Sequence, residues 1–210
     1  ITRSLNNFSK VERTELQACS INAAIENAVT MAHNEVRYRA NLVRDLKTVP
    51  LVLGSDGKLG QVFLNLVINA AHSIEEGAVN KNTISVRTWA DAKFVYAEVA
   101  DTGTGISPTN MSKIFEPFFT TKKAGVGSGL GLAICKSLIT EFGGDIRVES
   151  TIGKGTQFII QLPVYVVPKD IESLDTKGVL APFIKGRILI VDDEPAIRSA
   201  LSRLLKGHTL

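Results

Sequence analysis

The chain has 210 residues, of which 44% are hydrophobic and 21% charged, and this suits one full globular domain with smaller appendages. Its formal net charge is +3, and Lys and Arg are scattered rather than set in a stripe with aromatic residues, which disfavours nucleic acid as a partner. No apolar run reaches the ~18 residues of a membrane helix. No signal-peptide pattern is present, and Cys19 and Cys135 fit no metal or redox spacing, so we expect a cytoplasmic location and buried free thiols.

The first half of the chain contains two helical patterns and four strand patterns. Apolar residues recur at helical spacing over 21–36 and again over about 58–76, where the apolar face runs from Leu59 to Ile74. The segments NLVRDL, PLVLG, TISVRTWA and KFVYAEVAD, within 41–101, predict strands because β-branched and apolar residues dominate or alternate in them.

The stretch 101–129 is rich in Gly, Pro, Ser and Thr and predicts a long loop of the kind that often forms a lid. A helix is predicted over 130–142, followed by a hairpin of DIRVES and GTQFIIQLP. Helices and strands that do not alternate strictly favour an α/β (α+β) two-layer sandwich, in which helices cover one face of a mixed sheet. Residues 166–186 lose all periodicity and predict a linker.

The second helix carries a polar stripe opposite its apolar face. Gln61, Asn65 and Asn69 recur every four residues and His72 follows three later, so the four side chains point the same way. A solvated helix face would explain this stripe. Alternatively, an Asn oxygen can bind Mg²⁺ beside a triphosphate without adding negative charge.

Asp101 ends an apolar strand and is followed at once by Gly103 and Gly105. Asp and Gly are common turn residues, so a simple turn is one interpretation. In the other, the carboxylate accepts a hydrogen bond from an exocyclic amine such as that of adenine, and the glycines let the backbone approach the ring.

The segment IFEPFFTTKK within the long loop has three phenylalanines, Phe115, Phe118 and Phe119, which we expect to anchor the loop to the domain. Lys122 could reach a terminal phosphate as a point charge, whereas Lys123 is expected to be solvated.

Glycines at 125, 127, 129 and 131 lead directly into the third helix, whose first N–H groups have no partners within the helix. Such a helix start binds anions, although neither a P-loop nor a G-x-G-x-x-G pattern is present. A flexible glycine hinge for the lid is the structural alternative.

In this order, five motifs resemble the catalytic ATP-binding domain of sensor histidine kinases, a member of the Bergerat or GHKL ATPase family. They are the N box QVFLNLVINAAHS, the G1 box DTGTGI, the F box IFEPFFTTK, the G2 box GSGLGLAI and the late GKGTQF. The wording of the N and F boxes is most similar to kinases of the nitrogen-regulator type. The resemblance implies ATP and Mg²⁺ as cofactors and a catalytic domain over 18–165, preceded over 1–17 by the end of a dimerisation and phosphoacceptor helix.

The resemblance also implies the roles of individual residues. Asn69 would bind Mg²⁺, Asn65 would face the phosphates, Asp101 would bind the adenine amino group with Thr156 in support, and Lys122 would approach the γ-phosphate. Asn65, Asn69 and Lys122 are therefore the candidate catalytic residues. The candidate nucleotide-binding residues are Asn65, Asn69, His72, Asp101, Gly103, Gly105, Ile106, Lys122, Gly127, Ser128, Gly129, Leu130, Gly131, Leu132 and Thr156.

Three departures from the family pattern refine this expectation. Asn65 stands where the hydrolysing relatives have a water-activating Glu, which favours transfer to a protein side chain over hydrolysis. His72 replaces a Lys or Arg, so a phosphate contact there would depend on pH. No histidine has the acid and proline of a phosphoacceptor motif. His33 is a poor candidate, so the accepting histidine is expected upstream of Ile1 in a longer parent.

The tail RILIVDDEP resembles the start of a response-regulator receiver domain, truncated here to residues 187–210. Its paired Asp192 and Asp193 would form an incomplete Mg²⁺ site, because carboxylates gather oxygen ligands around a hard cation. The sequence thus predicts part of a hybrid histidine kinase whose partners are a histidine-bearing dimerisation module and a receiver domain or response regulator. We expect a homodimeric parent that is cytoplasmic or membrane-associated. The alternatives are a Bergerat-type ATPase and a non-catalytic nucleotide-binding module.

Overall fold

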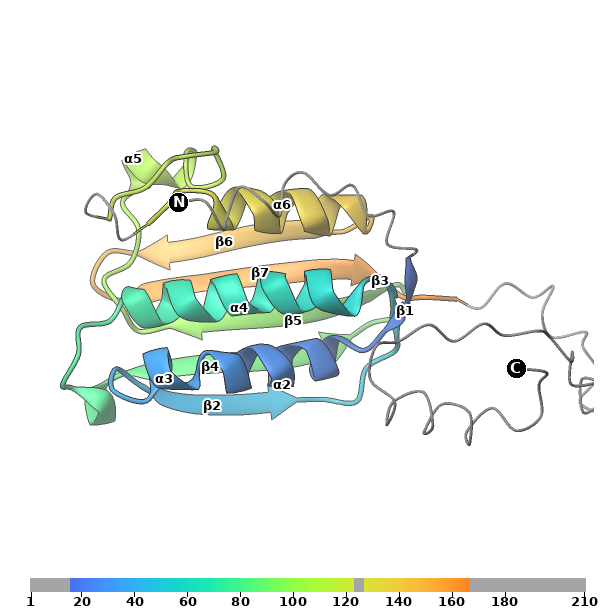
Figure 1. Ribbon diagram of the computed structural model, residues 1–210, viewed down its shortest axis with the longest axis horizontal. Coiled ribbons are helices and arrows are strands. Elements are labelled where there is room, and N and C mark those ends of the chain that lie inside the picture. The colour runs from blue at the N-terminus through green and yellow to red at the C-terminus, as the bar shows by residue number, and fades with distance from the viewer. Residues whose placement is uncertain (1–15, 123–126, 167–210) are drawn as a thin grey trace, which may run out of the picture. The chain divides into compact units, whose positions relative to one another are not determined.

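The computed structural model describes residues 16–122 and 127–166. Three helices lie side by side across one face of a five-stranded sheet (Figure 1). The helices that form this layer are α2 (Ile21–Met31), α4 (Asp56–His72) and α6 (Gly131–Glu141). The predicted two-layer sandwich with helices on one face is therefore confirmed.

The sheet is mixed, with the order β2-β4-β5-β7-β6. Its strands are β2 (Asn41–Leu46), β4 (Thr83–Ala90), β5 (Phe94–Asp101), β6 (Asp145–Thr151) and β7 (Gly155–Pro163). Strands β2 and β4 are parallel, and the other neighbours are antiparallel. A separate pair, β1 (Gln17–Cys19) and β3 (Val52–Gly54), is antiparallel. Strand β1 begins one residue before the predicted start of the domain.

The core lies between the helical layer and the sheet, because alternate residues of each strand face the helices. Val95, Ala97 and Val99 of β5 are almost fully buried, as are Leu59 and Phe63 of α4. Burial of one Leu or Phe side chain contributes about 1.5–3 kcal/mol, so these contacts fix α4 on the sheet. The two free cysteines are buried as expected, and burial raises the pKa of Cys19 to about 11 and that of Cys135 to about 12.

Two helix predictions were wrong in their extent. The pattern over 21–36 forms two helices, because α2 ends at Met31 and the short α3 (His33–Val36) follows after Ala32. Helix α4 ends at His72, so Ile74 is buried but lies beyond the helix. The N–H of Ser73 still bonds to the last turn, while its hydroxyl donates to the Ala70 carbonyl or to Asp101 on β5. These bonds tie the helix end to the sheet.

The described part of the predicted loop between β5 and α6 contains one short helix, α5 (Pro108–Met111), which begins at a proline. Proline suits this position because its fixed φ matches the helix and its missing N–H would have no partner there. A one-turn 3₁₀ helix, η1 (Val79–Lys81), precedes β4. In the described part of the chain no helix has both the length and the apolar character of a membrane span.

The face of the sheet opposite the helices is polar and aromatic. Arg87 lies 3.0 Å from the carboxylate of Glu98, which also accepts a hydrogen bond of 2.7 Å from Gln157. Although it is on this open face, the Glu98 side chain is only 5% exposed. Its two partners therefore satisfy a carboxylate that water hardly reaches.

Candidate functional site

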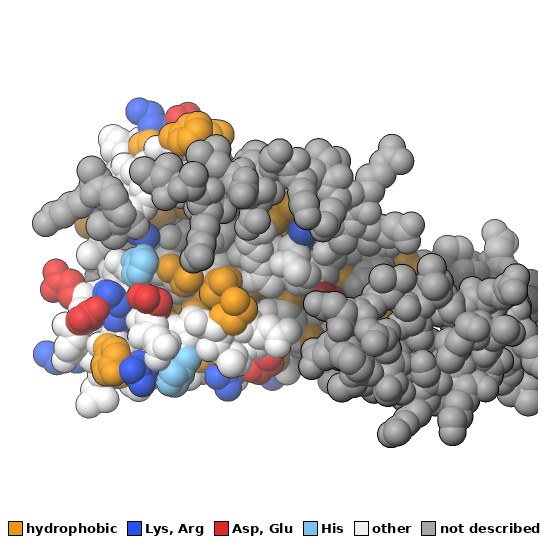
Figure 2. Space-filling model, in the orientation of Figure 1, with side chains coloured by type: hydrophobic (Ala, Val, Ile, Leu, Met, Phe, Trp, Pro, Cys, Tyr) orange, Lys and Arg blue, Asp and Glu red, His pale blue; other side chains and the backbone are white. Residues whose placement is uncertain are grey.

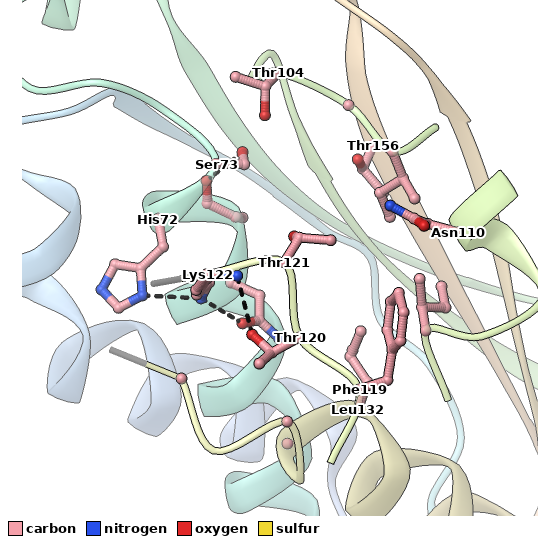
Figure 3. A pocket seen from close by; sticks show the side chains of 18 of the residues that line it. His72, Ser73, Thr104, Asn110, Phe119, Thr120, Thr121, Lys122, Leu132 and Thr156 are labelled. Carbon is pink, nitrogen blue, oxygen red and sulfur yellow. Dashed lines mark hydrogen bonds between the residues drawn. The ribbon is translucent and has the colours of Figure 1, made fainter. Parts of the chain in front are cut away.

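A cavity of about 620 Å³ opens between α4, the start of α6 and the loop that follows β5 (Figure 3). Its volume is in the range of small-molecule sites. The predicted site residues that line it are Asn65, Asn69, His72, Asp101, Gly105, Ile106, Lys122, Gly127, Ser128, Gly129, Gly131, Leu132 and Thr156. Gly103 and Leu130 do not line the cavity. Residues far apart in sequence thus meet in one hollow.

Asp101 lines this cavity from the last position of β5. One of its oxygens, Oδ1, accepts hydrogen bonds of 2.8 Å from the Ser73 hydroxyl and from the Gly103 N–H. Burial raises the pKa of Asp101, while the donors from Gly103, Ser73 and Thr156 oppose this shift. The donors hold the carboxylate in one orientation, with its remaining acceptor capacity available to the cavity.

The glycines beside Asp101 are required by close packing. A side chain at Gly103 would overlap Ser73, and one at Gly105, which has φ of 72°, would overlap the Thr151 backbone. Gly103 therefore does not line the cavity itself but allows its backbone N–H to reach Asp101. The sequence predicts that these glycines let the backbone approach a bound ring. In the structure they let the backbone pack closely against Ser73 and Thr151 of the protein itself.

Lys122, which follows the lid phenylalanines, lines the cavity and reaches back to helix α4 (Figure 3). Its Nζ lies 3.2 Å from Asn69 Oδ1 and 3.2 Å from His72 Nδ1. Burial, followed by repulsion from Arg39, lowers the pKa of Lys122. The ammonium group thus occupies the position that a cation bound to the Asn69 oxygen would take, so this oxygen is oriented to accept a positive charge.

Asn65 lies one turn before Asn69 and contacts the start of α6. Its Nδ2 donates to the Gly131 carbonyl over 3.5 Å, and a side chain added at Gly131 would lie 3.7 Å from Asn65 Cγ. The polar stripe therefore faces the cavity at Asn65, Asn69 and His72. Gln61 is exposed and does not line it, so only the second half of the stripe borders the cavity.

The lid phenylalanines differ in their environments. Phe115 and Phe119 pack against the core, and the ring of Phe115 meets that of Phe158 edge-on at 6.5 Å. Phe118 is 74% exposed and has a φ of 68°, so the expectation that it anchors the loop was wrong. Its backbone N–H instead bonds to the Gly129 carbonyl over 2.9 Å, which joins the two sides of the lid.

Sequence reasoning missed several polar residues at this site. Ser73 binds Asp101 directly, and Thr104, Asn110 and Thr120 also line the cavity (Figure 3). Ser73 directly follows the polar stripe and could have been found from it. Thr104 and Thr120 lie within the G1 and F boxes but were not chosen from them, and Asn110 lies between these two boxes, where no sequence signal distinguishes it.

Some predicted residues cannot be placed. Lys123 and Gly125 of the lid, and Asp192 and Asp193 of the tail, lie outside the described residues. Within 16–122 and 127–166, no group of three or more His, Cys, Asp or Glu side chains could hold a metal ion. A metal at Asn69 would therefore take most of its ligands from a bound molecule or water.

The fold, a mixed sheet with helices on one face, and the cavity beside α4 and α6 define an α/β domain with a small-molecule site, and comparison with known proteins identifies its family. The family model described as "Histidine kinase-, DNA gyrase B-, and HSP90-like ATPase" matches residues 54–166, more than half of the chain. The chain belongs to this family. Within it, the similar proteins are sensor histidine kinases, so residues 54–166 form the catalytic ATPase domain of a sensor histidine kinase.

Two curated relatives and one solved structure illustrate the similarity. The sensor kinase CckA of Brucella abortus (strain 2308) is 37% identical over 196 residues, covering 84% of this chain and 20% of CckA. The sensor histidine kinase ZraS of Escherichia coli (strain K12) is 33% identical over 172 residues, covering 81% of this chain and 36% of ZraS. The mycobacterial sensor histidine kinase MprB superposes with a TM-score of 0.62 at 27% identity, covering 70% of this chain and 97% of that structure. The chain thus spans about a fifth to a third of the length of these curated relatives.

Proposed function

We propose that this chain binds ATP with Mg²⁺ in the cavity and transfers the γ-phosphoryl group to a histidine of a dimerisation module. The observation that carries the proposal is that a partly buried acceptor, Asp101, and a cation-accepting amide, Asn69, line one cavity of suitable volume. Asp101 would accept a hydrogen bond from the adenine amino group. Asn69 would hold the magnesium ion, which supplies charge neutralisation to the phosphates.

The chain's own residues would then position the nucleotide. The N–H groups at the start of α6, from Gly131, would receive phosphate oxygens, and Asn65 beside them would face the phosphates. Lys122 would leave Asn69 and neutralise charge on the γ-phosphate, as expected for a loose phosphoryl transition state. Asn65 is an amide and cannot act as a general base for water, which supports transfer to a protein side chain rather than hydrolysis.

The wider context also belongs to this proposal. The accepting histidine would belong to a dimerisation module of a homodimeric parent, and a receiver domain or response regulator would take the phosphoryl group next. The hybrid architecture, the similarity to nitrogen-regulator kinases and the domain boundaries at 17, 165 and 186 remain predictions from the sequence. So do the cytoplasmic location and the incomplete metal site at Asp192 and Asp193.

Binding of a fluorescent ATP analogue tests the site. With Mg²⁺ present, Asp101→Ala and Asn69→Ala should each weaken binding about tenfold or more, since each removes a hydrogen bond or ligand to a charged or buried partner. Without Mg²⁺, the Asn69→Ala variant should bind like wild type, whereas the Asp101→Ala variant should stay weak. Unchanged binding of the analogue in both variants would reject the assignment of the site.

A second experiment tests phosphoryl transfer. Mixing the chain and ATP with a histidine-bearing module should phosphorylate that module. Steady ATP turnover without the module would favour the ATPase alternative.

A further inference from the structure

A chain of polar contacts runs from α3 to the cavity through four side chains. Glu35 Oε2 lies 3.2 Å from His72 Nε2, and His72 Nδ1 lies 3.2 Å from Lys122 Nζ. Lys122 Nζ in turn lies 3.2 Å from Asn69 Oδ1. Glu35 itself does not line the cavity. On the surface, basic, acidic and histidine side chains lie close together at this end of the helical face (Figure 2).

The contacts determine which ring nitrogen of His72 carries the proton. An ammonium group has only donors, so Nδ1 must accept from Lys122. The proton of the neutral ring is then on Nε2, where the Glu35 carboxylate accepts it. Such a second partner fixes both the tautomer and the orientation of a histidine ring.

Other charged groups near this chain do not replace Glu35. The guanidinium of Arg39 repels Lys122 and is itself held by the Ile74 carbonyl at 3.0 Å and by Glu76 at 2.7 Å. Among the residues that the structure describes, Glu35 is the one carboxylate that contacts His72.

We propose that Glu35 is a positioning residue that acts through His72 to hold Lys122 at the phosphate end of the cavity. The inference rests on the proposed function, in which Lys122 meets the γ-phosphate. If Glu35 is removed, the ring of His72 is free to turn, and Lys122 loses a fixed acceptor. Because ADP lacks the γ-phosphate, the effect should concern ATP and not ADP.

The test compares the dissociation constants of ATP and ADP, each with Mg²⁺, for the whole chain. Glu35→Ala should weaken ATP binding about three- to tenfold, the value of one hydrogen bond, and leave ADP binding unchanged. Glu35→Gln, whose amide oxygen still accepts from Nε2, should restore most of the ATP affinity. In a Lys122→Ala background, Glu35→Ala should have no further effect.

Glu75→Ala is the matched control, because Glu75 is an exposed acid close to His72 in sequence, with no hydrogen bond or ion pair in the described part of the chain. It should bind both nucleotides like wild type. Equal weakening of ATP and ADP by Glu35→Ala would show a merely structural role and overturn the proposal, as would an unchanged ATP affinity. If wild type bound neither nucleotide, the proposed function itself would fail, and this inference with it.

Discussion

Replacement of Gly129 by alanine should open the lid and weaken nucleotide binding without unfolding the domain. Gly129 has φ of 68°, in the left-handed region, where a side chain costs about 1–2 kcal/mol. A methyl group there would lie 2.6 Å from the carbonyl oxygen of Phe118 and 2.7 Å from its Cα. These are backbone atoms and cannot rotate away, so the segment around Phe118 must move.

The size of the effect follows from what the lid loses. The hydrogen bond from the Phe118 N–H to the Gly129 carbonyl, 2.9 Å long, contributes about 1 kcal/mol. Together with the backbone strain, the closed lid loses about 2–3 kcal/mol, which corresponds to about 30- to 150-fold weaker binding. The global stability should change little, because Phe118 is exposed and outside the core.

Titration with a fluorescent ATP analogue and Mg²⁺, alongside thermal unfolding, measures both quantities. Gly60→Ala is the matched control, since Gly60 is inside α4 and an added methyl group meets no atom within 4 Å. This control should bind normally and gain about 0.5–1 kcal/mol of stability from helix propensity. If Gly129→Ala bound the analogue as tightly as wild type, the lid conformation described here would not be the one that holds nucleotide.

Two further predictions concern charge. Burial raises the folded-state pKa of Asp101, so wild type loses stability as the pH rises from the ordinary pKa of the group to the raised one. Relative to wild type, Asp101→Asn should therefore gain stability over that interval of rising pH. Urea unfolding at a series of pH values would contradict this if the difference were flat or of opposite slope. Arg87→Ala should lower the free energy of unfolding by about 1–3 kcal/mol, because it leaves the buried Glu98 carboxylate with Gln157 as its partner. The control Arg147→Ala, at a side chain that is 73% exposed, should lower it by less than about 0.5 kcal/mol. Equal losses for the two variants in chemical denaturation would refute this reasoning.

The sequence predicted the layers, the order of the sheet's strands along the chain and about half of the cavity lining. Apolar periodicity marked α4 and α6 because the buried face of a helix must repeat with the helical turn. The polar stripe with Asn65 and Asn69, and the acid at the end of β5, were also visible. The end of α4 was not, because Ser73 bonds to a residue 28 positions away.

By itself, then, the sequence determined the main helices and strands, the resemblance to a family and the residue types available for a nucleotide. The tertiary structure decided which of them meet: Lys122 contacts Asn69, 53 residues earlier, and Glu35 contacts His72, 37 residues later. Such contacts depend on strand order and on the packing of the helices over the sheet. Local patterns of three to four residues carry no information about them.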